Sequence, residues 1–321
     1  MELYFESLRF MRVSEWFGEH YACLLEHNRE GTMLRLYNLN PSAGLAEGMA
    51  RGTACLCFSA TMTPQPYFQR LMGVAENSNW YRIAAPFDPG HLGVFSAPFI
   101  STAYRDRDAT LDELVQLVAD VVAQCRGNYI VFLPSHVYLA RVHERFCEMF
   151  PDVDCIRQVP GMSEMDREIF LGQFSDERAA TLVGFAIMGG VFGEAVDLKG
   201  SRLIGAIVVG VGLPGIGIER DLIRDYFDAC DEHGFEFAYQ YPGINRVMQT
   251  AGRVIRSESD RGIVCLVDRR FAEARYRTLL PKEWRIRQLT SRETLAREVG
   301  AFWRGVSDAG WQHRRSPDPP G

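Results

Sequence analysis

Lysine is nearly absent from this 321-residue chain: Lys199 and Lys282 are the only two, and the formal net charge is −6. A phosphate-binding P-loop requires the pattern G-x-x-x-x-G-K-[ST], and neither lysine lies in such a pattern. The sequence therefore excludes a P-loop of this kind within these residues. The negative net charge also argues against a broadly basic surface that coats nucleic acid, although it allows a local basic groove.

Cysteine pairs and long apolar runs are lacking too. The eight cysteines form no C-x-x-C pair and no group with metal-ligand spacing, and His136 and His143 lack a third ligand in the sequence. We therefore predict no metal site, and the scattered cysteines indicate reduced core residues of a cytoplasmic protein. No run approaches the ~20 apolar residues that span a bilayer, and the N-terminus has no signal-peptide core. We expect a soluble protein without membrane contact.

Strands and helices alternate along most of the chain. With 47% apolar and 24% charged residues the composition is that of an ordinary globular protein. Apolar runs followed by helical patterns of about 10 to 15 residues predict an α/β fold with a parallel sheet flanked by helices. The strands are expected at residues 93–97, 129–133, 155–158, 181–185, 203–209 and 263–268.

The length predicts roughly two domains. Residues 75–95 contain prolines and show no periodicity, so we place a boundary there and expect a first part at residues 1–85. A second part covers residues 86–285. Residues 286–321 form a helical extension and a polar, proline-containing tail that we expect to be disordered.

The first part begins with a helical apolar pattern over residues 1–30 and a short strand at 34–39. Residues 53–58 predict a doubly buried strand, which is followed by the small polar turn that holds Ser59 and Thr61. The carboxyl end of a strand is where open α/β sheets bind ligands. Alternatively, these two hydroxyls cap the helix expected at 67–72.

The stretch Gln249-Thr-Ala-Gly-Arg253-Val-Ile-Arg256 carries two arginines and an amide. If it is a helix, Gln249, Arg253 and Arg256 fall at i, i+4 and i+7 and share one face. Guanidinium groups match phosphate oxygens bidentately. The alternative is a solvated face whose arginines pair with Glu258 and Asp260.

A glycine-rich segment lies between two expected strands, Gly189-Gly-Val-Phe-Gly-Glu194-Ala-Val-Asp197. Its glycines allow close approach of the backbone to a phosphate, and its two acids suit contacts with arginines or a magnesium-bound nucleotide. An ordinary tight turn with solvated acids is the alternative. Ser135 follows another strand and suits either a nucleic-acid phosphate or a helix cap. Phe192 suits either base stacking or core packing.

These motifs resemble superfamily 2 helicases. Gln-x-x-Gly-Arg-x-x-Arg at 249–256 resembles motif VI, and with Asp260-Arg-Gly262 and Asp268-Arg-Arg-Phe271 it resembles the XPD/DinG branch of ATP-dependent DNA helicases. Residues 189–197 resemble motif V, except that Ala195 stands where the family usually has glycine. Residues 59–61 resemble motif III and residues 131–135 resemble motif IV. The resemblance covers residues 35 to 285.

The resemblance implies two RecA-like lobes with ATP between them, of which this chain would hold the end of the first and the whole second. Arg256, with Arg253 beside it, would be the arginine finger, worth ~10³–10⁵ in rate. Gln249 would sense the nucleotide or the neighbouring loop, and Ser59 and Thr61 would couple the lobes.

The resemblance also implies the partners. Glu194 and Asp197 would tie motif V to motif VI and to single-stranded DNA, and Gly190 would belong to the same nucleotide-side motif. Ser135 and Phe192 would contact the DNA. ATP and Mg2+ would be held mainly by the N-terminal helicase lobe, which is missing here together with the Asp-Glu-Ala-His box. Any iron–sulfur cluster would lie upstream of this chain, and the N-terminal helix would be an arch remnant.

Three functions therefore stand at this point. The first is the C-terminal lobe of an ATP-dependent DNA helicase that does not hydrolyse ATP alone. The second is a catalytically inactive RecA-like module that binds nucleic acid or a partner. The third is a different nucleotide-binding α/β enzyme, and the absence of G-x-G-x-x-G after the first strand counts against a Rossmann dehydrogenase.

Overall fold

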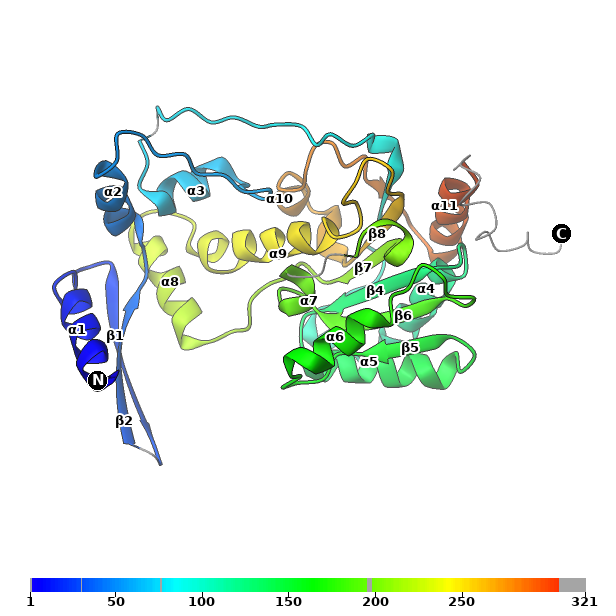
Figure 1. Ribbon diagram of the computed structural model, residues 1–321, viewed down its shortest axis with the longest axis horizontal. Coiled ribbons are helices and arrows are strands. Elements are labelled where there is room, and N and C mark those ends of the chain that lie inside the picture. The colour runs from blue at the N-terminus through cyan, green and yellow to red at the C-terminus, as the bar shows by residue number, and fades with distance from the viewer. Residues whose placement is uncertain (1, 30, 76, 195–197, 306–321) are drawn as a thin grey trace. The chain divides into compact units, whose positions relative to one another are not determined.

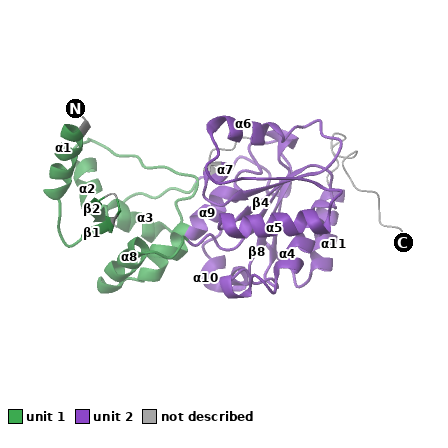
Figure 2. Cartoon of the chain, turned by 90° about the horizontal axis from the view of Figure 1, so that it is seen from below, with its two compact units in different colours: residues 1–82, 214–242 green, residues 83–213, 243–321 purple. Residues whose placement is uncertain are grey.

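A computed structural model describes residues 2–29, 31–75, 77–194 and 198–305. The chain divides into two compact units (Figure 2): unit 1 comprises residues 1–82 and 214–242, and unit 2 comprises residues 83–213 and 243–321. Residues 214–242, which the sequence analysis placed in the second part, thus pack within unit 1. The three-part division of the sequence stays a prediction, and the expected tail at 306–321 lies outside the described residues.

Unit 2 is built on a seven-stranded sheet of order β5-β6-β4-β7-β8-β3-β9, in which every strand pair is parallel (Figure 1). This confirms the predicted α/β fold with a parallel sheet. The strands are β3 (Leu92–Ala97), β4 (Asn128–Leu133), β5 (Asp154–Arg157), β6 (Leu182–Ile187), β7 (Gly205–Val209), β8 (Gly262–Val267) and β9 (Arg287–Gln288).

Helices follow the strands and cover the sheet. They are α4 (Leu111–Val122), α5 (His136–Met149), α6 (Glu164–Gly172), α7 (Val191–Glu194), α9 (Tyr241–Ala251), α10 (Ala274–Arg277) and α11 (Arg292–Gly305). The largest core cluster joins α4, α5 and α11 to one face of the sheet, through side chains such as Leu117, Phe146 and Trp303. Because side chains alternate along a strand, the intervening residues face the opposite layer.

Strands β4 and β8 explain why sequence alone located the sheet. All six residues of each strand are buried, so both faces are covered. Apart from Asn128, both runs are continuously apolar, as expected of a parallel sheet. Loops therefore gather at the carboxyl edge, where the residues after each strand lie.

Unit 1 contains α1 (Glu2–Ser14), α2 (Ser42–Ala50), α3 (Gln65–Met72), α8 (Ile218–Ala229) and a π-helix at Glu236–Gln240. Aromatic contacts hold the last three together: the ring of Tyr67 lies 5.3 Å from Phe237, which stacks on Phe227 at 4.1 Å. An ion pair between Arg70 and Glu232, with a nitrogen–oxygen distance of 2.6 Å, joins α3 to the segment after α8.

Two predictions for unit 1 are wrong. The helix expected over residues 1–30 ends at Ser14, and β1 (Tyr21–Asn28) pairs antiparallel with β2 (Gly31–Asn38). Pairing with a second strand overrides the local helical pattern. The buried strand expected at 53–58 is exposed irregular chain, with Leu56 84% exposed. No described strand pairs with it, and an apolar run without a partner cannot satisfy its backbone as a strand.

None of the described helices is long and apolar enough to cross a bilayer.

Candidate functional site

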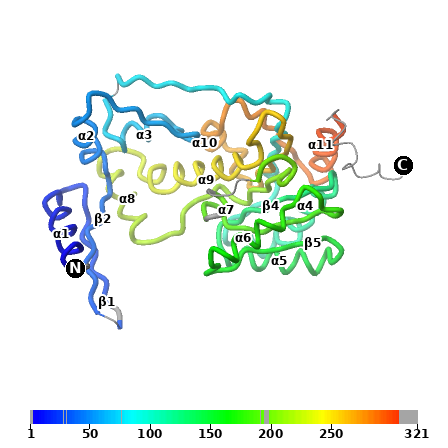
Figure 3. Tube along the Cα trace, in the orientation of Figure 1, coloured from blue at the N-terminus to red at the C-terminus, as the bar shows by residue number. Residues whose placement is uncertain are grey.

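The loop after β6 lies against α9 (Figure 3). Gly189 adopts φ +72, and a Cβ on it would lie 2.8 Å from Cδ of Arg246. A Cβ on Gly193 would lie 3.5 Å from the hydroxyl of Thr250. The glycines of the predicted phosphate loop therefore allow close packing of this loop against α9, and Arg246 is a residue of this contact that the sequence analysis missed.

The predicted three-residue face on one helix is wrong. Helix α9 ends at Ala251, so Gln249 stands in its last turn, whereas Arg253 and Arg256 lie in the loop that follows. The backbone tightens there, because the amides of Arg253 and Val254 donate to carbonyls three residues back. Spacing of i, i+4 and i+7 consequently does not set the directions of these side chains.

Arg253 contacts the glycine-rich loop directly. Its Nε donates to the carbonyl oxygen of Gly193 at 3.1 Å. This hydrogen bond joins the segment that resembles motif VI to the segment that resembles motif V. Gly190 is part of the same turn, with its amide donating to Ile187.

Asp260 fixes the loop that carries Arg256. It is 2% exposed, and its carboxylate accepts the backbone amides of Arg256 and Ser257 at 2.7 and 2.9 Å. The hydroxyl of Ser257 donates to the same carboxylate. Asp260 therefore acts on Arg256 through the backbone and sets where the loop leaves α9.

The loop after β7 packs on the first turn of α9. Gly212 has φ +70, and a Cβ on it would lie 2.3 Å from the carbonyl oxygen of Gly243. Only glycine permits both this conformation and this approach. Both ends of α9 are thus set by loops at the carboxyl edge of the sheet.

Two predicted DNA-contact residues have structural roles. Ser135 caps α5, where its hydroxyl accepts the amide of Tyr138 at 3.3 Å. Phe192 is fully buried, and its ring lies 4.6 Å from the ring of Phe170. Its side chain packs in the core and offers no face to a base in this structure, so the expected stacking role is corrected.

Ser59 and Thr61 belong to unit 1, in the irregular chain before α3. The hydroxyl of Ser59 accepts the amide of Thr61 at 3.3 Å. The alternative in which they cap the next helix is wrong, because the residue at the N-cap of α3 is Pro64.

Two acidic predictions cannot be placed. Asp197 lies outside the described residues, and the side chain of Glu194 at the end of α7 is likewise not described.

A polar network lies where β3 and β8 end, and the sequence analysis missed it. Asp268 is fully buried, accepts the Thr102 hydroxyl, and binds Arg270 Nε at 2.7 Å and Nη2 at 2.9 Å. Burial raises the pKa of Asp268, but the hydrogen bonds and charge of Arg270 and the hydrogen bond from Thr102 outweigh it. The net pKa is lower than that of an ordinary aspartate.

An arginine beside this network lies between two tyrosines. The Arg107 guanidinium carbon lies 4.4 Å from the ring centre of Tyr138 and 5.6 Å from that of Tyr104. Burial lowers the pKa of Arg107 and raises that of Tyr138 to about 12. Tyr104 is 87% exposed, so a cation and an open aromatic face occur together near the start of α5.

Comparison with known proteins identifies the family. A family model described as "Helicase C-terminal domain" matches residues 118–287, more than half of the chain. The chain belongs to this helicase family. It is the C-terminal portion of the XPD/DinG type, which confirms the resemblance of its motifs.

Named relatives of this helicase C-terminal domain are distant. It is 24% identical over 234 residues to "ATP-dependent DNA helicase DinG" of Photobacterium profundum, covering 71% of this chain and 33% of that protein. It is 20% identical over 225 residues to "ATP-dependent DNA helicase XPD" of Sulfolobus acidocaldarius, covering 67% of this chain and 39% of that protein. The chain therefore spans about a third to two fifths of the length of these relatives.

A solved structure named "XPD_Helicase" has the same fold, with a TM-score of 0.63 and 17% identity over 88% of this chain and 50% of that one. The parallel sheet of this helicase domain is thus RecA-like.

Proposed function

We propose that this chain is the second RecA-like lobe of an ATP-dependent DNA helicase and supplies Arg256 and Arg253 to the γ-phosphate of ATP. The triphosphate and its Mg2+ would be held mainly by a first lobe that carries the P-loop and the acidic box. An arginine in that position stabilises charge that develops on the transferred phosphoryl group. Arg256 would be the finger, and Arg253 would position the loop beside it.

The observation that carries the proposal is the hydrogen bond from Arg253 to Gly193. A guanidinium bound to the backbone of the glycine-rich loop couples that loop to the segment that ends in Arg256. A shift of the loop when it contacts DNA or nucleotide would then move the arginine segment. Gln249 in the last turn of α9 lies at the start of the same segment.

Single-stranded DNA would lie along the carboxyl edge near the start of α5. The exposed ring of Tyr104 offers a stacking face, worth ~1–3 kcal/mol per base, and Arg107 beside it offers positive charge. Ser135 uses its oxygen as an acceptor in the cap, so its O–H donor suits a phosphate oxygen. This assignment replaces Phe192, whose ring is buried.

An ATPase assay tests the proposal. The 321-residue chain alone is expected to show no DNA-stimulated hydrolysis of ATP. The same chain joined to the P-loop lobe of a related helicase is expected to hydrolyse ATP at a rate on the order of 1–100 s⁻¹ when single-stranded DNA is added. Turnover of that size by the chain alone would refute the division of labour between lobes.

The same joined protein separates a helicase lobe from an inactive binding module. A module binds DNA through Tyr104 and Arg107 but does not accelerate the first lobe. A joined protein that hydrolyses ATP no faster than the isolated P-loop lobe would therefore favour the module and overturn the proposed function.

A further inference from the structure

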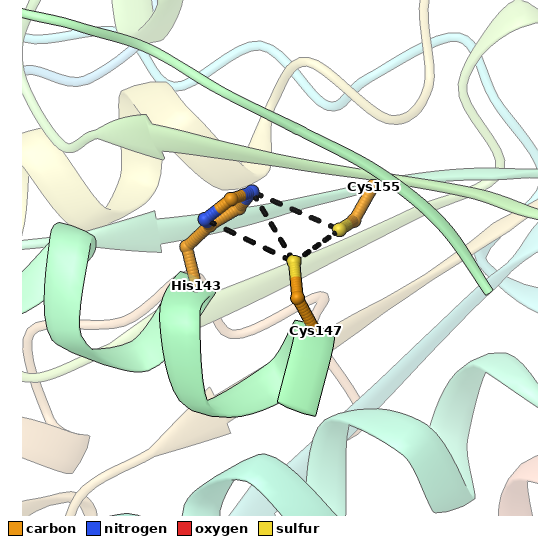
Figure 4. Close-up of side chains that lie close together, drawn as sticks. All are labelled: His143, Cys147 and Cys155. Carbon is orange, nitrogen blue, oxygen red and sulfur yellow. Dashed lines mark hydrogen bonds between the residues drawn. The ribbon is translucent and has the colours of Figure 1, made fainter. Parts of the chain in front are cut away.

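One histidine and two cysteines converge at the edge of the sheet, on the helix and strand that follow the motif IV-like residues 131–135. His143 and Cys147 lie one turn apart on α5, and Cys155 lies on β5 (Figure 4). Their ligand atoms all lie within 4.8 Å of one another. The sequence analysis predicted no metal site because Cys155 comes from a separate element, and no short spacing marks it.

The distances fit a tetrahedral metal on two of three edges. Nε2 of His143 lies 3.6 Å from Sγ of Cys147 and 3.7 Å from Sγ of Cys155. Zinc bonds of ~2.3 Å to sulfur and ~2.0–2.1 Å to nitrogen give a tetrahedral sulfur–nitrogen edge of about 3.6 Å. The imidazole nitrogen is therefore equally placed toward both sulfurs at the required separation.

The sulfur–sulfur distance is the edge that must change. The two Sγ atoms lie 2.8 Å apart, whereas a shared tetrahedral metal requires about 3.8 Å and a disulfide requires about 2.05 Å. Both cysteines are partly exposed, so a separation by about 1 Å needs only a small side-chain rotation. A disulfide between the two cysteines would not involve the imidazole. It would therefore not explain why Nε2 of His143 lies close to both sulfurs.

The surroundings hold the imidazole in place. The His143 ring packs edge-on against Phe185, at 5.4 Å between centroids and 87° between planes. Two charges near His143 neutralise one another, because Arg157 pairs with Glu144 at 3.0 Å. Asp154, which precedes Cys155, pairs with Arg178. Two thiolates and a neutral imidazole would balance a divalent cation.

We propose that His143, Cys147 and Cys155 form a site for a divalent transition metal of the zinc class, with solvent as the fourth ligand. Two thiolates and an imidazole select zinc-like metals over magnesium or calcium, which prefer oxygen ligands. The metal would tie α5 to β5, a four-residue strand at the end of the sheet that pairs with β6. The site stands apart from the proposed ATP chemistry.

Metal titration of the full chain tests the site. The protein is purified in reductant, stripped with a chelator and titrated with Co2+ alone, then Zn2+ alone. We expect one metal per chain, a thiolate-to-cobalt charge-transfer band with the visible bands of tetrahedral cobalt, and loss of both when zinc displaces cobalt. His143→Gln, Cys147→Ser and Cys155→Ser are each expected to weaken zinc binding by at least about 100-fold, because loss of even an outer-shell partner costs 10–100-fold.

Two control variants remove other donors. Cys55→Ser/Cys57→Ser removes an exposed pair whose sulfurs lie 3.8 Å apart, and His136→Gln removes the other histidine of α5. Both are expected to keep one metal and the cobalt bands. Loss of binding in Cys55→Ser/Cys57→Ser, with retention in Cys147→Ser, would place the metal elsewhere and overturn the proposal.

Alkylation of the wild-type chain requires no variant, so it tests the site even if one of the substituted proteins fails to fold. Zinc is expected to protect Cys147 and Cys155, but not Cys23 or Cys230, from iodoacetamide, as read by peptide mass spectrometry. Equal labelling with and without zinc would overturn the site. Three other results would also overturn the site. They are a Cys147–Cys155 disulfide in protein kept in reductant, a titration in which no metal binds, and binding of iron in place of zinc.

Discussion

Replacing Asp260 with alanine tests whether one buried carboxylate holds the arginine loop. The change removes the acceptor of the Arg256 and Ser257 amides, whose hydrogen bonds measure 2.7 and 2.9 Å. Each buried donor left without a partner costs about 1–3 kcal/mol. Glu258 and Ser259 in the same loop are exposed, so water can reach the two amides once the carboxylate is removed. The summed cost of the two unpaired amides therefore lies near the lower end of its range. We expect a loss of about 2–3 kcal/mol in the free energy of unfolding.

Two matched variants grade the effect. Asp260→Asn keeps an acceptor oxygen but loses the charge, so we expect the free energy of unfolding to fall by about 1 kcal/mol. Glu258→Ala removes an exposed carboxylate two residues away and should change stability by less than about 0.5 kcal/mol. Denaturant unfolding measures the free energy of unfolding of the three variants and so ranks them. Hydrogen exchange over residues 254–260 shows whether the loss of stability lies in this loop. Asp260→Ala that unfolds like wild type, with unchanged exchange at Arg256 and Ser257, would refute the role of this carboxylate.

Two further predictions concern neighbouring parts of unit 2. Gly189→Ala is expected to lower the free energy of unfolding by about 1–2 kcal/mol because of its left-handed backbone, and its Cβ would also displace Arg246. Gly190→Ala should lower it by less than about 0.5 kcal/mol, because its Cβ would make only ordinary contacts. Equal losses of stability in thermal melts of the two variants would contradict this packing. The pKa of Asp268 is lowered in the folded state, so its stabilising effect is full above the unfolded pKa of about 4 and is lost as pH falls through the folded pKa. Asp268→Ala should lower the free energy of unfolding by about 3–5 kcal/mol near neutral pH, because it leaves Arg270 half-buried and without its carboxylate. The variant should also lose less stability than wild type as the pH falls below about 4. The same loss of stability at acid pH in both proteins would contradict this.

The sheet could be predicted from sequence because its strands are buried on both faces. The runs within β4 (after Asn128) and β8 (Gly262–Val267) are continuously apolar, and helical patterns separate them. Parallel strands also place their carboxyl ends at one edge, so the loops that follow the strands lie at that edge. These are local signals, and they are strong where tertiary contacts reinforce them.

Side-chain directions in the site could not be predicted, because tertiary contacts set them. Spacing suggested one helical face for Gln249, Arg253 and Arg256, but α9 ends before the arginines and Asp260 fixes the loop. Phe192 looked available for stacking, yet Phe170 from another helix covers its ring.

The remaining errors share one cause: the partner of a residue lies far along the chain. The apolar run at residues 53–58 resembles a strand in isolation, but no described strand pairs with it. Cys155 joins His143 and Cys147 only because β5 lies beside α5. A pattern within one segment does not report such a neighbour.

DNA-stimulated ATPase of the joined two-lobe protein with Arg256→Ala tests the central claim most directly. Arg277→Ala, on the exposed side of α10, serves as the control. If Arg256 stabilises the transferred phosphoryl group, kcat falls by about 10³-fold while KM for ATP changes little, and the control keeps its rate. A fall in kcat of less than tenfold would contradict the claim and leave Arg256 with a structural role.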